Sequence, residues 1–467
     1  MKFVLKTDLK EVLTDTMTPV SMYLKIRDSF PESVLLESSD YGANDNSVAY
    51  LCFNPIASFK VHNRVMSQTF PDGTVQETVV TKDVSVVDAL ETFISRFETA
   101  IPETRFLSNG LFGYTSYEAV QYFEDIELTK KEGDVGIPEL YYALYQNIIA
   151  VNVFNNQATL FAHCYERESN LEEIEQLLKA PARDSFSFER KGEPTSNMED
   201  AEFVELVKKG IGHCMRGDVF QIVLSRRFSQ AFKGDDFTLY RILRSINPSP
   251  YIFYFDFGDY KIFGSSPEAQ LVVDNGLAEI HPIAGTFIRT GNDAQDEARA
   301  VALAKDLKEN AEHMMLVDLA RNDLSRHGHN VVVEKDREVQ FYSHVIHLVS
   351  KVTGQKKEGT STMQIVADTF PAGTLSGAPK HKAMQLIEAY ETRDRAFYGG
   401  AIGFIDFKGN YNHAIIIRSF LSKDNTLHYH AGAGVVSKSD PESELQEVYN
   451  KLRALNTAME KAENHIL

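Results

Sequence analysis

The chain has 467 residues, of which 43% are hydrophobic, so it can bury a large core as two or three domains or as one interwoven domain. Its formal net charge of −18 argues against nucleic acid as a partner, because a nucleic-acid-binding protein presents a basic face. The three cysteines lie far apart and form no C-x-x-C pair, so they imply neither a disulfide framework nor a zinc site.

The start of the chain, MKFVLKTDLKEV, lacks the uninterrupted apolar stretch of a signal sequence, because Lys6 and Asp8 break it. No later apolar run approaches the length of a membrane span. We therefore expect a cytoplasmic protein that does not use a membrane.

The first 160 residues contain short β-favouring runs separated by turn signals such as Pro71-Asp-Gly73. These runs predict strands at 33–37, 48–53 and 141–154. A short charged helix is predicted at 168–179, and residues 180–198 are rich in Pro, Ser, Arg and Glu. We place a boundary in that stretch, between an N-terminal part (1–180) and a C-terminal part (195–463).

The C-terminal part alternates helical periodicity with pairs of strand-like runs. Helices are predicted at 199–216, near 293–324 and at 442–463. Strands are predicted at 220–227, 251–256, 260–264, 270–274, 339–353, 398–407, 411–422 and 427–436. Strands that come in adjacent pairs between helices favour an α+β fold with antiparallel sheets over a parallel βαβ sheet.

Two neighbouring motifs indicate a ligand site. Residues 373–380 read Gly-Thr-Leu-Ser-Gly-Ala-Pro-Lys, and the HAGAGVV run at 430–436 is followed by Asp440-Pro-Glu-Ser-Glu-Leu-Gln-Glu447. A Gly- and Thr-rich turn presents backbone N–H groups that can hold an anion, whereas Glu444 and Glu447 lie close together on a helix and can hold a divalent cation. The pair of motifs suggests a carboxylate substrate bound through a metal, although each alone is also typical of a tight turn or a solvated helix face.

Further carboxylates share helical faces with apolar residues. Glu312 falls on the same face as Leu316 and Leu319, with Glu309 one turn before it. Carboxylates among residues that favour burial need a cation or a proton. A metal and ion pairs with Lys or Arg both remain open from these residues alone.

The order of these motifs, together with Ser265-Ser-Pro-Glu268, His281-Pro-Ile-Ala-Gly-Thr286 and Asn247-Pro-Ser-Pro-Tyr-Ile-Phe253, resembles the chorismate-utilising enzymes over nearly the whole chain. The resemblance implies a four-layer α/β/β/α core in which two mainly antiparallel sheets pack on each other. It also implies Mg²⁺ as the cofactor, with Glu312 and Glu447 as ligands and Glu309 and Glu444 beside them. Magnesium takes few carboxylates and keeps several waters, which suits this set.

Two positions distinguish the members of this family. The members that attack chorismate with water carry Lys where this chain has Gln221, and an amide cannot act as a general base. Many aminodeoxychorismate synthases carry a nucleophilic Lys in place of Ala284. The resemblance therefore implies that ammonia attacks directly, as in the anthranilate-forming branch of tryptophan biosynthesis, where chorismate and ammonia give anthranilate and pyruvate.

The resemblance also assigns roles within the site. Glu268 is implied to be the general acid that protonates the departing C4 hydroxyl, which requires a desolvated or acid-crowded pocket. His347 is implied to act in pyruvate elimination, and Gln221 and Thr374 are grouped with the catalytic residues. The implied substrate contacts are Tyr398 and Arg418, which hold the enolpyruvyl carboxylate, and Gly285, Thr286, Gly432, Gly434 and Lys451.

A second ligand site is implied for tryptophan as a feedback inhibitor. Its residues are Leu36, Glu37, Ser38, Asn247, Pro250, Tyr251 and Ile252, with Glu37 expected to meet the ammonium group of the ligand. The family often has Met where this chain has Ile252, which concerns the affinity for the inhibitor more than its identity.

No glutaminase motif is visible, so the resemblance implies a separate glutamine amidotransferase subunit and a hetero-oligomer. The alternatives are an aminodeoxyisochorismate or aminodeoxychorismate synthase, and a catalytically silent amino-acid-sensing protein on the same scaffold. The Leu35-Leu-Glu-Ser38 motif and His347 weigh against the two synthases. Glu268, Glu312 and Glu447 together weigh against the silent protein.

Overall fold

The computed structural model describes residues 2–38, 47–100, 104, 106–181, 186–341 and 345–464. No helix in these ranges is long and apolar enough to cross a membrane. The helices are α1 (Pro19–Ile26), α2 (Val86–Ile94), α3 (Leu171–Lys179), α4 (Asp200–Arg216), α5 (Asp236–Ile246), α6 (Asp293–Lys305), α7 (Leu307–His327), α8 (Thr362–Thr369), α9 (Lys380–Tyr390) and α10 (Pro441–Asn464), with the 3-10 turns η1 (Tyr117–Tyr122) and η2 (Gly373–Leu375).

The strands are spread over the whole chain, and those of the described ranges pair antiparallel except for β1 with β6. They are β1 (Phe3–Leu13), β2 (Val34–Glu37), β3 (Val48–His62), β4 (Val65–Thr69), β5 (Val75–Val79), β6 (Phe97–Thr99), β7 (Leu111–Thr115), β8 (Leu140–Asn152), β9 (Gln157–Cys164), β10 (Phe188–Ser196), β11 (Gln221–Gly234), β12 (Tyr251–Asp256), β13 (Tyr260–Ser266), β14 (Ala269–Asp274), β15 (Leu277–Ile280), β16 (Ile283–Ile288), β17 (Gly328–Phe341), β18 (Val345–Lys356), β19 (Gly377–Ala378), β20 (Ala401–Ile405), β21 (Tyr411–Ile415), β22 (Ser419–Lys423) and β23 (Thr426–Val435). The α+β class predicted from the sequence is confirmed.

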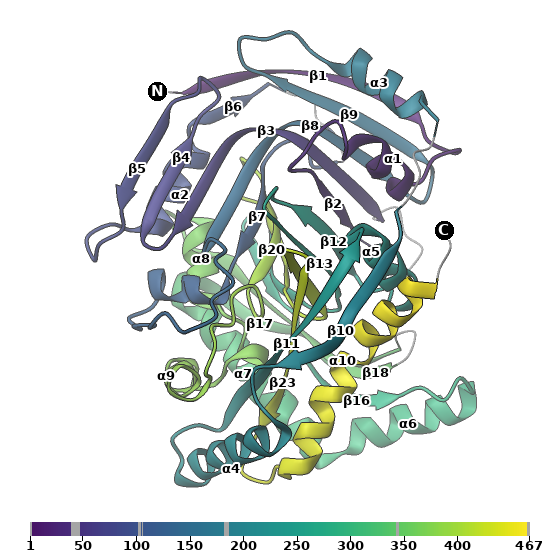
Figure 1. Ribbon diagram of the computed structural model, residues 1–467. Helices are drawn as coiled ribbons and strands as arrows, with labels where there is room; N and C mark the ends of the chain where they lie inside the picture. Colours follow the sequence, from purple (N-terminus) through teal and green to yellow (C-terminus); the bar gives the residue numbers. More distant parts are fainter. Residues whose placement is uncertain are drawn as a thin grey trace.

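Two layers of strands lie between two layers of helices (Figure 1). In one layer the strand order is β10, β11, β23, β22, β13, β12 and β2. In the other layer it is β7, β20, β21, β14, β15, β18 and β17. Strands β3 and β8 join the two layers, because β2 pairs with β3, β3 with β8, and β8 with β7.

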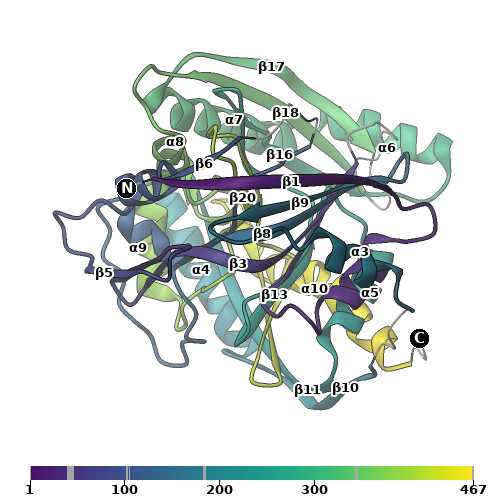
Figure 2. The ribbon, with the colours of Figure 1, turned by 90° about the horizontal axis from the view of Figure 1, so that it is seen from above.

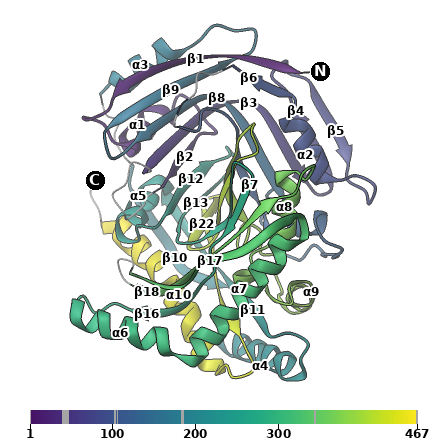
Figure 3. The ribbon, with the colours of Figure 1, turned by 180° about the vertical axis from the view of Figure 1, so that it is seen from behind.

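Helices cover the outer faces of both layers. Helices α4, α5 and α10 pack on the layer that contains β11 and β23, and α6, α7 and α8 pack on the layer that contains β14 and β18. Figure 2 shows α6 and α7 with β17 on one side of the molecule and α10 with β10 and β11 on the opposite side. Figure 3 shows α7 and α8 from behind, below β3, β8 and β9. The four-layer α/β/β/α arrangement is therefore confirmed.

Strand alternation in β12 shows how the sequence builds these layers. Phe253 and Phe255 point into an apolar cluster between the two strand layers, whereas Ile252 and Tyr254 point into the cluster under the helices. Successive side chains of a strand face opposite sides, so a strand buried on both faces has to be apolar at every position. Each fully buried large apolar side chain contributes about 1.5–3 kcal/mol relative to exposure.

The two parts proposed from the sequence share strand pairings. Strand β2 of the N-terminal part pairs with β12, and β7 pairs with β20. The stretch chosen as the boundary contains β10, which pairs with β11. The division into two parts stays a prediction, but both parts contribute strands to the same layers.

Three predicted elements are divided in the structure. The strand expected at 339–353 covers the end of β17 and the start of β18, which pair antiparallel with each other. The long helix expected near 293–324 is two helices, because the backbone of Asp306 is extended and its Oδ1 accepts a hydrogen bond of 3.0 Å from the Glu309 N–H, capping α7. The strand expected at 411–422 is also two strands, β21 and β22, because Arg418 adopts φ +51° between them. A non-glycine residue with positive φ interrupts the extended backbone of a strand.

Candidate active site

Glu268 occupies the short turn between β13 and β14. The Oγ1 atom of Thr374 in η2 donates a hydrogen bond of 3.0 Å to Oε1 of Glu268. Burial raises the pKa of Glu268 to about 7, although this hydrogen bond and the charges of Lys451 and Arg418 act to lower it. A carboxyl with this pKa is substantially protonated near neutral pH, as the role of a general acid requires.

Arg418 is placed by strained backbone between β21 and β22. Its φ is +51°, and its carbonyl accepts a hydrogen bond of 3.2 Å from the N–H of Ser265, close to the Glu268 turn. Backbone strain of this kind is tolerated where the surrounding structure holds it and is concentrated at functional sites. The guanidinium acts electrostatically on both Glu268 and His347, so these three side chains belong to one site.

Tyr398 is buried beside the same groups. Its ring stacks on His430, with the ring centroids 5.1 Å apart and an angle of 13° between the planes. Burial raises the pKa of Tyr398, while Arg395 and Arg418 lower it. The phenol therefore stays a neutral hydrogen-bond donor, which can pair with a carboxylate next to Arg418.

His347 in β18 is held in one tautomer. Its Nδ1 lies 2.9 Å from the carbonyl oxygen of Gly285, and burial lowers the pKa of the imidazole to about 4. Because a carbonyl can only accept, Nδ1 carries the proton and Nε2 carries the lone pair near neutral pH. His347 can thus act as a neutral base through Nε2.

Gly285, whose carbonyl contacts His347, occupies a position where a larger residue would not fit. Gly285 adopts φ +71°, and a Cβ there would lie 2.9 Å from Leu303 Cδ1 and 3.2 Å from Glu309 Oε2. Glu309 therefore reaches the His347 region, as the sequence predicts for the carboxylate set. Thr286 lies opposite His347 in the β16–β18 register, but its side chain lies outside the described part of the structure.

Gln221 begins β11 and faces the first carboxylate of the predicted metal pair. Its Nε2 donates to Glu312 Oε1 at 3.4 Å, and a Cβ at Gly434 would lie 2.4 Å from the same Nε2. Gly434 is therefore needed for this side-chain position. The Gln221 Oε1 atom is buried and has no hydrogen-bond partner among the described residues, so an acceptor is available to a small N–H donor.

The second carboxylate of the pair lies on α10. Lys451 Nζ contacts Glu447 Oε1 at 2.6 Å and donates to the carbonyl of Gly432 at 2.8 Å. A Cβ at Gly432 would lie 2.9 Å from the hydroxyl oxygen of Tyr398, so α10, β23 and Tyr398 meet at this glycine. Glu444 is buried one turn earlier on α10. Within the described ranges, no three His, Cys, Asp or Glu side chains group as a metal site.

The segments predicted to bind an inhibitor come together in the β2–β12 pairing. Ile252 lies opposite Glu37, and Phe253 lies opposite Leu36. Glu37 is buried and accepts hydrogen bonds from Arg244 Nε at 2.7 Å, Arg244 Nη2 at 2.8 Å and Tyr240 Oη at 2.7 Å. The sequence predicts that this carboxylate binds an ammonium group, but in the structure Arg244 already pairs with both of its oxygens. Arg244 lies on α5, a helix that was not predicted from the sequence.

The remaining residues of these segments surround the start of β12. Ser38 is exposed at the end of β2, and Pro250 and Tyr251 are half-buried. Asn247 ends α5 and donates through Nδ2 to the carbonyl of Ser265 at 3.4 Å. The segments are therefore linked to the strand that leads into Glu268.

A buried ion pair that supports the site was also missed. Arg395 donates to Glu391, to the carbonyl of Leu375 at 2.6 Å and to the carbonyl of Val223 at 2.8 Å. Glu391 in turn accepts from the N–H of Ser225 at 2.8 Å. The pair ties η2, which carries Thr374, to β11, which carries Gln221. In the sequence, the charged run from 391 to 395 has the composition of a solvated turn, so no local signal marks it.

Comparison with known proteins finds relatives that match most of this chain. The family described as chorismate binding enzyme matches residues 32–457. Anthranilate synthase component 1 of Aquifex aeolicus is 38% identical over 97% of this chain and 94% of that protein. The crystal structure of anthranilate synthase component I from Streptococcus pneumoniae is 32% identical, covers 87% of this chain and 92% of that chain, and has a TM-score of 0.77. The menaquinone-specific isochorismate synthase of Escherichia coli has the same fold, with a TM-score of 0.73 at 18% identity over 98% of this chain and 95% of that chain.

Proposed function

This chain belongs to the chorismate binding enzyme family, and from that membership we propose that it is the large subunit of an anthranilate synthase, which converts chorismate and ammonia to anthranilate and pyruvate. The observation that carries the proposal is the pairing of Gln221 with Ala378, four residues after the Thr374 that donates a hydrogen bond to Glu268, whose pKa is raised to about 7. Glu268 supplies a proton to a leaving hydroxyl. Gln221 can bind ammonia but cannot activate water.

In the first chemical step, Glu268 gives its proton to the C4 hydroxyl of chorismate, which leaves as water. Arg418 and Tyr398 bind the enolpyruvyl carboxylate, because a guanidinium and a neutral phenol both donate hydrogen bonds to it. The Arg418 charge also opposes the build-up of positive charge on His347, which keeps that imidazole neutral. These residues orient the substrate and hold the acid and the base in separate protonation states.

Ammonia attacks C2 of the ring as the hydroxyl leaves. The Gln221 Oε1 atom can accept a hydrogen bond from ammonia and so orient its lone pair toward C2, while Nε2 is engaged by Glu312. The ammonium group formed at C2 loses one proton to solvent. In the second step His347 Nε2 takes the proton from C2 while the C3–O bond breaks, so the ring becomes aromatic. The enolpyruvyl group leaves as the enolate of pyruvate, which takes up a proton at its methylene carbon.

The carboxylates of α7 and α10 fit a magnesium ion. Carboxylate oxygens are the ligands that Mg²⁺ prefers, and two protein carboxylates leave room for water and for a substrate carboxylate. Glu312 and Glu447 would hold the ion, with Glu309 and Glu444 nearby, which is supported by the contacts of Glu312 with Gln221 and of Glu447 with Lys451. When bound, the ion would neutralise the carboxylate of the substrate.

Three further features belong to this proposal. A glutamine amidotransferase partner would supply the ammonia, which the names "component 1" and "component I" of the relatives support. Tryptophan would inhibit by binding at the β2–β12 segments, which is supported by the link from Asn247 to Ser265. The protein would be located in the cytoplasm.

Incubation of the protein with chorismate, ammonium and Mg²⁺ tests the function, with products identified by fluorescence and mass. We expect anthranilate and pyruvate in equal amounts, and both formed at least about 10²-fold more slowly by the Glu268→Gln variant. Release of an amino-deoxy intermediate without pyruvate would favour one of the aminodeoxy synthases. Tryptophan binding without any turnover would favour an amino-acid-sensing protein.

A further inference from the structure

A small, partly open cavity adjoins the general acid. Its volume is about 40 Å³, and Glu268 and Thr374 line it together with Gln270, Thr369 and Asp323. A water molecule needs about 10–15 Å³ of such volume and two to four polar partners, so the cavity has room and partners for about three waters. The remaining lining is apolar and includes Leu316, Leu319 and Ala320 of α7.

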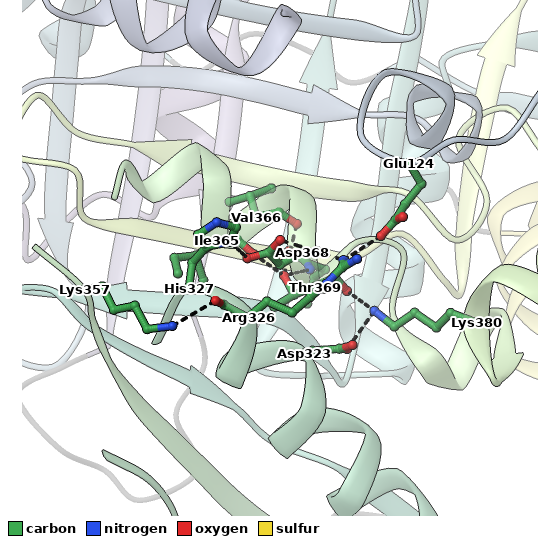
Figure 4. A network of polar contacts seen from close by, with 11 residues as sticks. Glu124, Asp323, Arg326, His327, Lys357, Ile365, Val366, Asp368, Thr369 and Lys380 are labelled. Carbon is green, nitrogen blue, oxygen red and sulfur yellow. Dashed lines mark hydrogen bonds and ion pairs between the residues drawn. The ribbon is translucent and has the colours of Figure 1, made fainter. Parts of the chain in front are cut away.

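Asp323 is the second carboxyl on this cavity, near the end of α7. It is only 8% exposed and pairs with Lys380 Nζ at 2.7 Å (Figure 4). Burial raises the pKa of Asp323 to about 6, and Asp368 also raises it, whereas Lys380 and Arg326 lower it. Asp323 thus exchanges protons near neutral pH.

A network of polar side chains lies beside Asp323 in two bonded groups, one around Lys380 and one around Asp368. Lys380 Nζ donates to the carbonyl of Thr369 at 2.8 Å as well as to Asp323. The neighbouring Asp368 accepts from His327 Nδ1 at 2.5 Å and lies 3.8 Å from Arg326. Figure 4 shows these side chains converging from α7, α8 and α9, with Glu124 on the outer side of Arg326.

The His327 side chain is 42% exposed, so the network reaches solvent. Lys380, Arg326 and Asp368 act electrostatically on Asp323, and Lys451 and Arg418 act on Glu268.

We propose that water in this cavity returns a proton to Glu268 after each turnover, with Asp323 as the proton donor at the far end. The inference rests on the proposed function, in which Glu268 loses one proton to the departing hydroxyl. The Asp323 carboxyl gives its proton to a cavity water, and that water gives a proton to the Glu268 carboxylate. Asp323 then recovers a proton from solvent, which reaches the neighbouring group of side chains at the exposed His327.

The geometry separates this role from substrate binding. The charges of Arg418 and Lys451, two of the proposed substrate contacts, act on Glu268. Asp323 lines the same cavity as Glu268 but forms its ion pair with Lys380 of α9. Asp323 is therefore a positioning and proton-relay residue. Its loss should affect repeated turnover more than the first one.

The test compares the first turnover with later ones at pH 6, where Glu268, with a pKa of about 7, starts mostly protonated. Asp323→Asn leaves Lys380 unpaired, so the double variant Asp323→Asn/Lys380→Met is measured beside it. Ala320→Leu fills the cavity without changing a titratable group, since Ala320 is a buried lining residue. Asp318→Asn is the matched control, because Asp318 is an exposed carboxylate on the same helix, 3.1 Å from Arg321.

In rapid-mixing experiments we expect all three cavity variants to form up to one equivalent of product at the parent rate. Steady turnover should then slow by about tenfold or more, which is within the range of proton-transfer contributions. The solvent isotope effect on kcat should rise, while Asp318→Asn should match the parent. Slow product release would give a burst in the parent protein as well, so the burst of each variant is compared with that of the parent.

Equal slowing of the first and later turnovers would show a structural role and overturn the relay. So would an unchanged kcat and isotope effect in the cavity variants. A parent protein that forms no product from chorismate and ammonia would overturn the proposed function, and the relay with it.

Discussion

Thr374 Oγ1 donates a hydrogen bond of 3.0 Å to Glu268 Oε1, joining the 3-10 turn η2 to the turn between β13 and β14. This bond favours the carboxylate, whereas burial favours the neutral acid, and the balance places the pKa of Glu268 at about 7. One hydroxyl group therefore adjusts the protonation of the general acid.

Thr374→Val should raise the pKa of Glu268 further, because it removes the hydrogen bond that stabilises the carboxylate. The acid acts only when protonated, so kcat/KM of the parent should fall as pH rises through about 7. In the variant that alkaline limb should move up by about one pH unit. A pH profile of kcat/KM measures it, and Thr374→Ser should restore the parent position. An unmoved limb would show that Glu268 is not the group that titrates.

Glu268→Gln should lower kcat by about 10²- to 10⁴-fold, the usual contribution of a general acid. It should also stabilise the fold above pH 7. The folded-state pKa is raised from 4.5 to about 7, so the folded protein binds more protons than the unfolded chain within that window. Stability of the parent is therefore lost as pH rises through the window.

Urea unfolding at pH 4 and pH 8 checks this second effect. The variant should gain on the order of 1–3 kcal/mol over the parent at pH 8 and about nothing at pH 4. Glu442→Gln, at an exposed position of α10, is the control. A gain of the same size at both pH values would contradict the assigned pKa.

Glu447→Gln should abolish turnover at ordinary Mg²⁺ concentrations and leave the fold intact, because it removes a proposed ligand from the exposed side of a regular helix. The Mg²⁺ concentration for half-maximal activity should rise by at least about 10- to 100-fold. Glu460→Gln on the same helix is the matched control, since Glu460 is exposed. Parent-like activity at limiting Mg²⁺ would exclude Glu447 as a ligand.

Gln221→Lys should lose most anthranilate formation and gain some isochorismate or salicylate, because a desolvated lysine can take a proton from water and an amide cannot. The lysine would point toward Glu312, which lies 3.4 Å from the native amide nitrogen. Product analysis with and without ammonium measures the change. Gln221→Met should lose anthranilate without the new product, and unchanged anthranilate formation by the lysine variant would remove position 221 from the nucleophile site.

Tryptophan should bind the inactive Glu447→Gln variant with parent affinity, because Glu447 pairs with Lys451, whereas Glu37 of the β2–β12 segments pairs with Arg244. Calorimetry measures the binding, and saturating chorismate should weaken it without displacing it fully. Strict competition with chorismate, or no binding at all, would contradict a second site.

The sequence by itself determined the chemical groups of the site and the class of the fold. Glu268, Gln221, Thr374 and Arg418 lie within short motifs, so their residue types and spacing are visible without coordinates. Strand periodicity likewise depends on adjacent residues, and it predicted β2, β12 and most later strands near their observed positions.

Only the tertiary structure decided what surrounds those groups. The Arg395–Glu391 pair, the contacts of Glu37 with α5 and the cavity between Glu268 and Asp323 join residues that are distant in the chain. The break of the expected long helix at Asp306 is local, but the helical periodicity continues across it and hides it. Burial and long-range hydrogen bonds set the pKa values of Glu268 and His347, and both depend on which distant side chains fill the space around a group.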